Sequence, residues 1–244
     1  MSGSAVPRPV IPVVVFPGSN DDRDAQLALT GLGADAPRVW HTDEALPDGT
    51  VAVVVPGGFS FGDYLRCGAI ARTSPIMRAV TAFADAGGLV LGICNGFQIL
   101  AEARLLPGVL RPNASLAFIC RDVPLVVERV DTPFTSRCAD APERELSIPI
   151  KHVEGCWFAD DELLAEVEAN GQVALRYRTG ANPNGSVADV AGVLNAAGNV
   201  FGLMPHPEHA VDSLLGSTDG ALILGSLVDA VADPQARALM SAHA

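Results

Sequence analysis

Three short apolar segments in the first half of the chain constrain its fold most strongly. Val10 to Phe16, Val51 to Val55 and Leu89 to Ile93 are rich in β-branched residues, and each runs into a loop that opens with proline or cysteine. Polar or amphipathic stretches of helical character follow the first and third segments. Apolar strands that alternate with helices predict a parallel sheet covered on both faces, which is a doubly wound α/β fold of the flavodoxin-like type.

The second half of the chain has a different pattern of shorter strand-like runs. They are Ser115–Cys120, Val123–Val130, Leu146–Ile150, Val173–Arg178, Val187–Leu194 and Val200–Leu203. These runs predict additional antiparallel strands, so that the sheet is mostly parallel but mixed. Gly198-Asn199 predicts a hairpin turn, and a helix is expected from Leu222 to Val231. No repeat or linker divides the sequence, and we expect residues 1–244 to form one domain.

Composition excludes several classes of protein. A net charge of −12 and a pI near 4.7 would repel a phosphate backbone, so we expect no nucleic-acid partner. The apolar runs are far shorter than the roughly 20 residues of a membrane span, and the first residues lack the pattern of a secretory signal. We therefore expect a cytoplasmic protein without membrane contact. The only lysine, Lys151, does not lie in a Walker A loop, so no such nucleotide site is expected.

The segment Gly92-Ile93-Cys94-Asn95-Gly96 carries the strongest functional signal. It follows an apolar strand, precedes a helical pattern, and has the form G-x-S-x-G of a nucleophile elbow with cysteine in the serine position. Four other cysteines lie far apart without a C-x-x-C pair, which indicates reduced thiols rather than disulfides or a zinc site. A residue at the tip of a strand-to-helix turn points away from the core, and the helix N-terminus favours a thiolate. We predict that Cys94 is a nucleophile.

A cysteine nucleophile requires a proton donor and acceptor, and the chain has only five histidines. His206 follows a late apolar strand and stands two residues before Glu208, which in an extended segment places both on one side. Glu208 would then orient the His206 ring as in a catalytic triad. His206 and His209 also resemble a pair of metal ligands, but no third ligand is evident nearby in the sequence, so no metal site is predicted.

The same chemistry requires backbone amides that stabilise an oxyanion. One donor is expected from Asn95, because its N–H directly follows the nucleophile. The other should come from a loop at the end of a neighbouring strand, and Gly57-Gly58 after the second apolar segment is the natural candidate. A Gly-Gly pair on its own is a weak signal, since simple turns use it as well. We predict Gly58 as the second donor.

Taken together, these motifs resemble the class I glutamine amidotransferases, whose triad combines cysteine, histidine and glutamate. The resemblance is closer to one branch, the glutaminase subunits of phosphoribosylformylglycinamidine synthase. The sequence blocks that carry this closer resemblance are "FPGSNDDRD", "PGGFSFGDYLRCGAIAR", "GICNGFQIL", "NPNGS" and "GNVFGLMPHPE". Together they span most of the chain, and the second block separates this branch from other triad amidotransferases.

The resemblance implies a role for each matching residue. Cys94 would attack the side-chain amide of glutamine, His206 would act as general acid and base, and Glu208 would orient His206. Gln98 and the loop Gly57-Gly58 would lie along the bound glutamine. The products would be ammonia and a γ-glutamyl thioester, which water would hydrolyse.

The resemblance also implies partners. The ammonia would pass to a separate synthetase subunit, which converts formylglycinamide ribonucleotide to formylglycinamidine ribonucleotide in purine biosynthesis, and a small third subunit would complete the complex. ATP and magnesium are expected on the synthetase subunit, and no cofactor is expected in this chain. Glutamine is the expected substrate.

Three positions depart from the residues usual in this family. Asp21 stands in place of a cysteine, Phe61 in place of a tyrosine, and His209 in place of an arginine. The block "IPIKHVEGCW", with His152 and Glu154, matches its counterpart only loosely. Three alternatives remain open: another triad amidotransferase subunit, a flavodoxin-like cysteine hydrolase that does not use glutamine, and a catalytically silent module that binds a synthetase.

Overall fold

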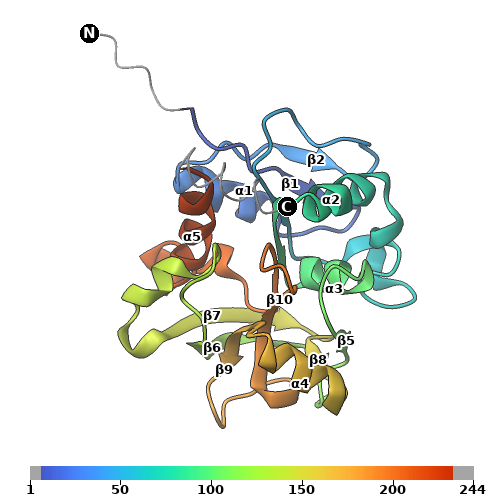
Figure 1. Cartoon of the computed structure of the whole chain (residues 1–244). Coiled ribbons are helices and arrows are strands. Elements are labelled where there is room, and N and C mark those ends of the chain that lie inside the picture. The colour runs from blue at the N-terminus through green and yellow to red at the C-terminus, as the bar shows by residue number, and fades with distance from the viewer. Residues whose placement is uncertain (1–6, 233–244) are drawn as a thin grey trace.

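The computed structural model describes residues 7–232 and shows an α/β fold built on a nine-stranded mixed sheet (Figure 1). The strands in spatial order are β2 (Arg38–Trp40), β1 (Val13–Val15), β3 (Ala52–Val55), β4 (Leu89–Ile93), β11 (Val200–Leu203), β10 (Val190–Leu194), β9 (Val173–Tyr177), β6 (Ile119–Val127) and β7 (Glu145–His152). A separate two-stranded sheet pairs β5 (Val109–Arg111) with β8 (Cys156–Phe158).

The strands from β2 to β11 are parallel and form the half of the sheet that the apolar segments predict. Every residue of β3, β4 and β11 is buried, because helices cover both faces of this half. α1 and α5 lie on one side of it, and α2 and α3 lie on the other (Figure 1). The helices are α1 (Asp22–Gly31), α2 (Pro75–Asp85), α3 (Asn95–Glu102), α4 (Asp161–Ala169) and α5 (Gly220–Ala232). The predicted doubly wound α/β fold is confirmed.

The strands from β11 to β7 are antiparallel and form the other half of the sheet. β11 belongs to both halves: it pairs antiparallel with β10 through the predicted hairpin and parallel with β4. The expectation that Val200–Leu203 is purely antiparallel is therefore wrong on one edge. This strand leads the chain from the antiparallel half back beside β4, whose end carries the elbow cysteine.

Two further predictions in this half are wrong in detail. The run Val187–Leu194 is a strand only from Val190, because Val187–Asp189 form a short 3₁₀ turn. The runs Ser115–Cys120 and Val123–Val130, which were expected to be separate strands, contribute to the single strand β6. The residues of the first run before Ile119 form turns and bends instead. Arg121 and Asp122 interrupt the apolar pattern, yet their backbones pair with Ile150 and Pro149 of β7 while their side chains are exposed. Polar side chains do not break a strand whose backbone hydrogen bonds continue, since those bonds need no apolar side chain.

Three loops meet at the carboxyl ends of the parallel strands, as the fold predicts. Ser19, after β1, makes an isolated antiparallel bridge with Gly58, after β3. Gly58 has φ 141°, and a Cβ there would lie 2.6 Å from the backbone nitrogen of Asn20. Gly96, in the first turn of α3, lies so close to the Val55 carbonyl oxygen that no side chain fits between them. Glycine is needed at both positions because the three loops touch through their backbones.

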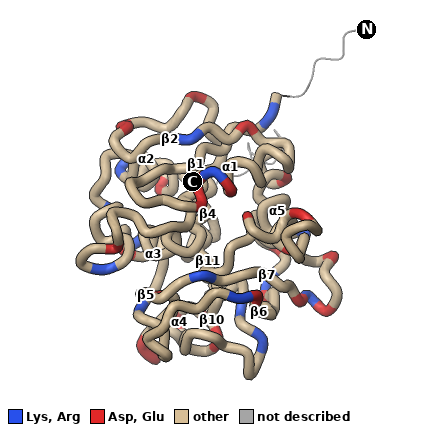
Figure 2. Tube along the Cα trace, turned by 180° about the vertical axis from the view of Figure 1, so that it is seen from behind, with Lys and Arg blue, Asp and Glu red and all other residues tan. Residues whose placement is uncertain are grey.

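The charged residues are spread over the described part of the chain. Figure 2 shows basic and acidic positions interspersed on both halves of the molecule, without a basic cluster. None of the helices within residues 7–232 combines the length and apolar character that a membrane crossing needs.

Candidate active site

Cys94 lies at the sharp turn between β4 and α3. Its backbone has φ 49° and ψ −103°, in a region that residues with a Cβ rarely adopt, and its N–H donates to the Leu203 carbonyl at 2.8 Å. A Cβ at Gly92 would lie 2.8 Å from the backbone of Gly96, so the elbow needs both glycines. The Cys94 sulfur is 3.9 Å from the Lys151 carbonyl oxygen. The elbow predicted from the sequence is present, and it joins the nucleophile to the end of β11.

His206 follows β11 by three residues, in the turn that leads to Glu208. Its Nδ1 lies 2.7 Å from Glu208 Oε1, and its backbone N–H donates to the Pro149 carbonyl at 2.8 Å. Both side chains are at most 2% exposed. Among the described residues the Nε2 atom of His206 is buried without a hydrogen-bond partner. The pair therefore has the predicted geometry, with one ring nitrogen held and the other available.

The charge of His206 follows from its neighbours. Burial by itself lowers the pKa of His206, but the Glu208 carboxylate and the nearby Cys94 sulfur outweigh burial and raise the pKa to about 10. The ring is thus an imidazolium at neutral pH. A charged imidazole beside a cysteine is suited to give a proton to a leaving group after the thiolate attacks.

A small pocket opens beside Cys94. Its lining comes from the loop after β3, from α3 and from the end of β7, and it includes Gly58, Asp63, Gln98, His152 and Glu154. The Gln98 amide is held at both ends: its nitrogen donates to the Glu154 carbonyl, and its oxygen accepts from Asn95 Nδ2 at 2.8 Å. The Asn95 oxygen in turn accepts from the Ser60 N–H at 3.1 Å. These bonds tie the three parts of the pocket wall together.

The two predicted oxyanion donors border the same pocket. Asn95 is the first residue of α3, so its N–H has no acceptor within the helix. Gly58 lines the pocket in a backbone conformation that side chains rarely allow. The neighbouring Gly57 lies against His206, since a Cβ there would be 2.7 Å from His206 Cε1 and 2.5 Å from Asp21 Oδ2. The loop after β3 therefore touches both the pocket and the pair of His206 and Glu208.

A second buried histidine, His152, lies in the pocket wall with a different character. Its Nδ1 is 2.9 Å from Asn113 Oδ1, and the Asn113 nitrogen donates to the carbonyls of Ala117 and of His152 itself. Because the Gly155 N–H also donates to Asn113 Oδ1, that atom is an acceptor and His152 Nδ1 carries the proton. Burial, with a contribution from His206, lowers the pKa of His152 to about 3. This ring is neutral.

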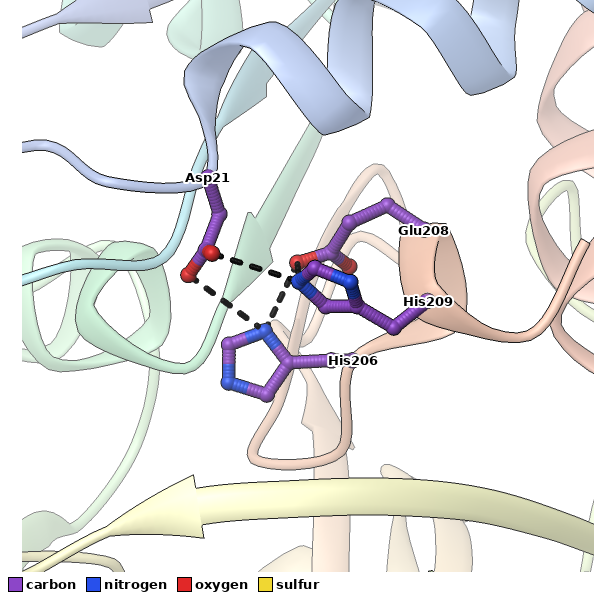
Figure 3. Close-up of side chains that lie close together, drawn as sticks. All are labelled: Asp21, His206, Glu208 and His209. Carbon is purple, nitrogen blue, oxygen red and sulfur yellow. Dashed lines mark hydrogen bonds and ion pairs between the residues drawn. The ribbon is translucent and has the colours of Figure 1, made fainter. Parts of the chain in front are cut away.

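Asp21 and His209, two of the departures from the family pattern, lie against the pair of His206 and Glu208 (Figure 3). Asp21 Oδ2 is 3.6 Å from His206 Nδ1, and His209 Nε2 is 3.6 Å from Glu208 Oε1. Side chains that could serve as further metal ligands do lie near the two histidines in space, because ligand atoms of Asp21, His206, Glu208 and His209 all lie within 4.8 Å of one another. The Lys151 ammonium contacts Asp21 and His209, so a metal ion would have to displace that cation.

Two features of the sequence point to this cluster of Asp21, Lys151 and His209. Asp21 and His209 were two of only three departures from the family pattern, and Lys151 is the only lysine. Residues 21, 151 and 209 are far apart in the chain, so their contact depends on tertiary structure.

Comparison with known proteins assigns the class. The family model described as the CobB/CobQ-like glutamine amidotransferase domain matches residues 8–219. The chain therefore belongs to this family of glutamine amidotransferases. This finding excludes the alternative of a cysteine hydrolase unrelated to glutamine.

Individual relatives narrow the class to one branch. The chain is 55% identical over 227 residues to phosphoribosylformylglycinamidine synthase subunit PurQ of Salinibacter ruber, covering 90% of this chain and 95% of that protein. It is 56% identical over 216 residues to the PurQ subunit of Rubrobacter xylanophilus, covering 88% and 96%. A chain in the structure of PurLQS from Thermotoga maritima aligns with a TM-score of 0.81 and 45% identity, covering 91% of this chain and 98% of the other.

Proposed function

We propose that the chain is the glutaminase subunit of phosphoribosylformylglycinamidine synthase and that Cys94, His206 and Glu208 form its catalytic triad. The observation that carries the triad is its geometry: a strained cysteine at the strand-to-helix turn, near a buried histidine whose Nδ1 is held by a carboxylate. Membership of the amidotransferase family and the PurQ relatives support the assignment of substrate and complex.

The first half of the reaction uses His206 as an acid. The Cys94 thiolate attacks the carboxamide carbon of glutamine, and the backbone N–H groups of Asn95 and Gly58 stabilise the oxyanion that forms. His206 Nε2 then donates its proton to the departing nitrogen, the C–N bond breaks, and ammonia leaves. A γ-glutamyl thioester on Cys94 remains. The raised pKa of His206 ensures that the proton is present at the start.

The second half uses the same ring as a base. After the first proton transfer His206 Nε2 is free to take a proton from water, which attacks the thioester carbon. Collapse of the second tetrahedral intermediate releases glutamate and restores the thiolate beside the imidazolium. Glu208 holds the Nδ1–H throughout, which keeps Nε2 directed at the reacting atoms.

The ammonia serves a synthetase subunit in this proposal. That subunit would bind ATP and magnesium and convert formylglycinamide ribonucleotide to formylglycinamidine ribonucleotide, and a small third subunit would complete the assembly. The similarity to a chain of PurLQS supports an assembly of this kind. This chain would contribute glutamine hydrolysis alone.

Two cysteines near the pocket allow a sharp test of the nucleophile. Cys67 also lines the pocket, but burial raises the pKa of its thiol far above the usual range, and the Asp63 and Glu154 carboxylates add to this effect. Treatment with a diazoketone analogue of glutamine should therefore modify Cys94 and leave Cys67 unmodified. Peptide mass spectrometry identifies the adduct, and excess glutamine should block it.

The variants complete the test. Cys94→Ala should abolish both the adduct and glutamate release. Cys120→Ser should change neither, because Cys120 is exposed and does not line the pocket, although it pairs with Lys151 in the register of β6 and β7. Adducts on several cysteines, or labelling that glutamine does not suppress, would contradict the triad.

The complex is tested separately: with purified synthetase and third subunits, ATP and magnesium, glutamine should support formylglycinamidine ribonucleotide synthesis by wild type but not by Cys94→Ala. Ammonium should support it with both.

A further inference from the structure

Asp21 is a buried carboxylate that its own helix does not use. It precedes α1 at the N-cap position, where an aspartate commonly accepts a hydrogen bond from the first turn, but its side chain makes no such bond. The side chain is 4% exposed and points instead toward the turn that carries His206 and His209 (Figure 3). Its backbone N–H contacts the Gly57 carbonyl at 3.4 Å. The loop after β1 thus brings a second carboxylate to the triad.

Each oxygen of Asp21 has a different environment. Oδ1 accepts a hydrogen bond from Lys151 Nζ and lies 3.2 Å from His209 Nε2. Oδ2 lies 3.6 Å from His206 Nδ1, beyond hydrogen-bond range but within reach of an ion pair. The Glu208 oxygen on the same ring nitrogen is closer, at 2.7 Å. His206 Nδ1 therefore faces two carboxylates: that of Glu208, which is hydrogen-bonded to it, and that of Asp21, which lies slightly beyond hydrogen-bond distance.

The cluster keeps Asp21 charged despite its burial. Burial by itself raises the pKa of Asp21, but His209, His206 and Lys151 outweigh it and hold the pKa far below its usual value. A buried carboxylate costs free energy unless cations or donors compensate it. Lys151 links this compensation to the nucleophile, because its backbone carbonyl lies 3.9 Å from the Cys94 sulfur while its side chain holds Asp21.

We propose that Asp21 is a positioning residue of the reaction: it shares with Glu208 the orientation of the His206 ring, and it accepts the hydrogen bond from Nδ1–H when Glu208 is absent. This inference rests on the proposed glutaminase function. Closing the gap from 3.6 Å to about 2.8 Å needs a movement of less than about 1 Å. Lys151 and His209 anchor Oδ1 on the far side, which aims Oδ2 at the ring.

A double-mutant cycle tests the proposal. Glu208→Ala removes the bonded carboxylate. Asp21→Asn removes the second one, because the new amide will direct its oxygen to the Lys151 ammonium and its NH₂ toward Nδ1–H, where it cannot accept. We expect kcat to fall about 10²-fold in Glu208→Ala and less than about tenfold in Asp21→Asn, with a double variant at least about tenfold below the product of the two effects.

A spectroscopic readout separates positioning from a merely structural effect. In ¹⁵N-labelled protein, the Nδ1–H proton of His206 should remain visible and hydrogen-bonded in Glu208→Ala and should be lost in the double variant. Asp24→Asn is the matched control, since Asp24 is a half-exposed carboxylate on the same helix, 3.8 Å from His209. It should leave both kcat and the Nδ1–H signal unchanged.

Two results would overturn the proposal: single effects on kcat that multiply without coupling, or loss of the Nδ1–H signal already in Glu208→Ala. The second result needs only the single variant, so a double variant that fails to fold leaves the test intact. Failure of the proposed function is distinguishable, because it would appear as a wild-type protein without glutaminase activity in the complex, whereas the spectroscopic result requires no activity.

Discussion

The molecule contains two regions built around a buried histidine, and one ring is positively charged whereas the other is neutral. His206 lies beside the centre of the sheet, after β11, and is 1% exposed; His152 ends the edge strand β7 and is 3% exposed. The pKa of His206 is raised to about 10, whereas the pKa of His152 is lowered to about 3. Burial is similar in the two regions, so the difference in charge must have another cause.

The hydrogen-bond acceptor at Nδ1 decides whether each ring is charged. His206 Nδ1 is bonded to the carboxylate of Glu208, whereas His152 Nδ1 is bonded to the neutral amide oxygen of Asn113. A charged acceptor compensates the desolvation of an imidazolium, but a neutral amide does not. One region therefore holds a charged ring, and the other holds a neutral ring with a fixed tautomer in the pocket wall.

The largest expected effect separates the two rings by function. His206→Gln should lower kcat for glutamine hydrolysis about 10³-fold or more, because it removes both the acid and the base. His152→Gln should lower kcat less than about tenfold, since a neutral ring with an acceptor Nε2 has no proton to give. Steady-state kinetics with the partner subunits measures both, with His41→Gln as the control outside the pocket. Equal losses in the two variants would break the comparison.

Exchanging the acceptors of the two Nδ1–H groups, a carboxylate for an amide and the reverse, should bring the pKa values of the two rings closer together. Glu208→Gln lowers the pKa of His206, because burial is then opposed by less negative charge, and Asn113→Asp raises the pKa of His152 by placing a carboxylate on its Nδ1. NMR titration of the imidazole nitrogens should show the two values moving toward each other. An unchanged His152 in Asn113→Asp would mean that burial alone sets its charge.

Each ring also packs against a glycine, which offers a matched pair of steric tests. A methyl at Gly57 would lie 2.5 Å from Asp21 Oδ2 and 2.7 Å from His206 Cε1, and a methyl at Gly155 would overlap the His152 ring. We expect Gly57→Ala to lower kcat about tenfold or more by displacing the catalytic ring. Gly155→Ala should lower the free energy of unfolding by about 1–3 kcal/mol. Urea denaturation of both variants checks this contrast between lost activity and lost stability. A Gly57→Ala variant that is destabilised but keeps its kcat would refute it.

The smallest effect, counted per pH unit, is the pH dependence of stability, which the two rings impose in opposite directions. Between pH 3 and 6.5 the unfolded chain protonates His152 while the folded chain does not, so this ring makes stability rise with pH. Between pH 6.5 and 10 the folded chain keeps a proton on His206 that the unfolded chain loses, so stability falls as pH rises. Each slope is at most about 1.4 kcal/mol per pH unit.

Denaturant midpoints across this range should therefore have a maximum near pH 6.5. His152→Gln should flatten the acid limb, and His206→Gln should flatten the alkaline limb. The stability that Asp21 contributes through its lowered pKa is fully present above about pH 3.8 and is lost as the pH falls below that value, so Asp21 does not affect the limbs between pH 3.8 and 10. An alkaline limb that persists in His206→Gln would show that another group causes it.

Much of this site was predictable because its signals are local. The apolar segments specify parallel strands, since only a sheet covered on both faces buries every residue of β3, β4 and β11. The elbow at Cys94 and the pair His206 and Glu208 each lie within a few consecutive residues, so their local geometry follows from the backbone. Their roles as a triad stay a prediction that the proposed experiments test.

What the sequence determined by itself is thus the α/β fold, the strained cysteine and a histidine beside its carboxylate. Tertiary structure alone decided that Asp21, Lys151 and His209 surround that histidine and that His152 meets Asn113 rather than a carboxylate. The physical reason is that a pKa depends on charges within a few ångströms in space. Residues 21, 113, 151 and 209 come that close to these rings only after the sheet has brought distant segments together.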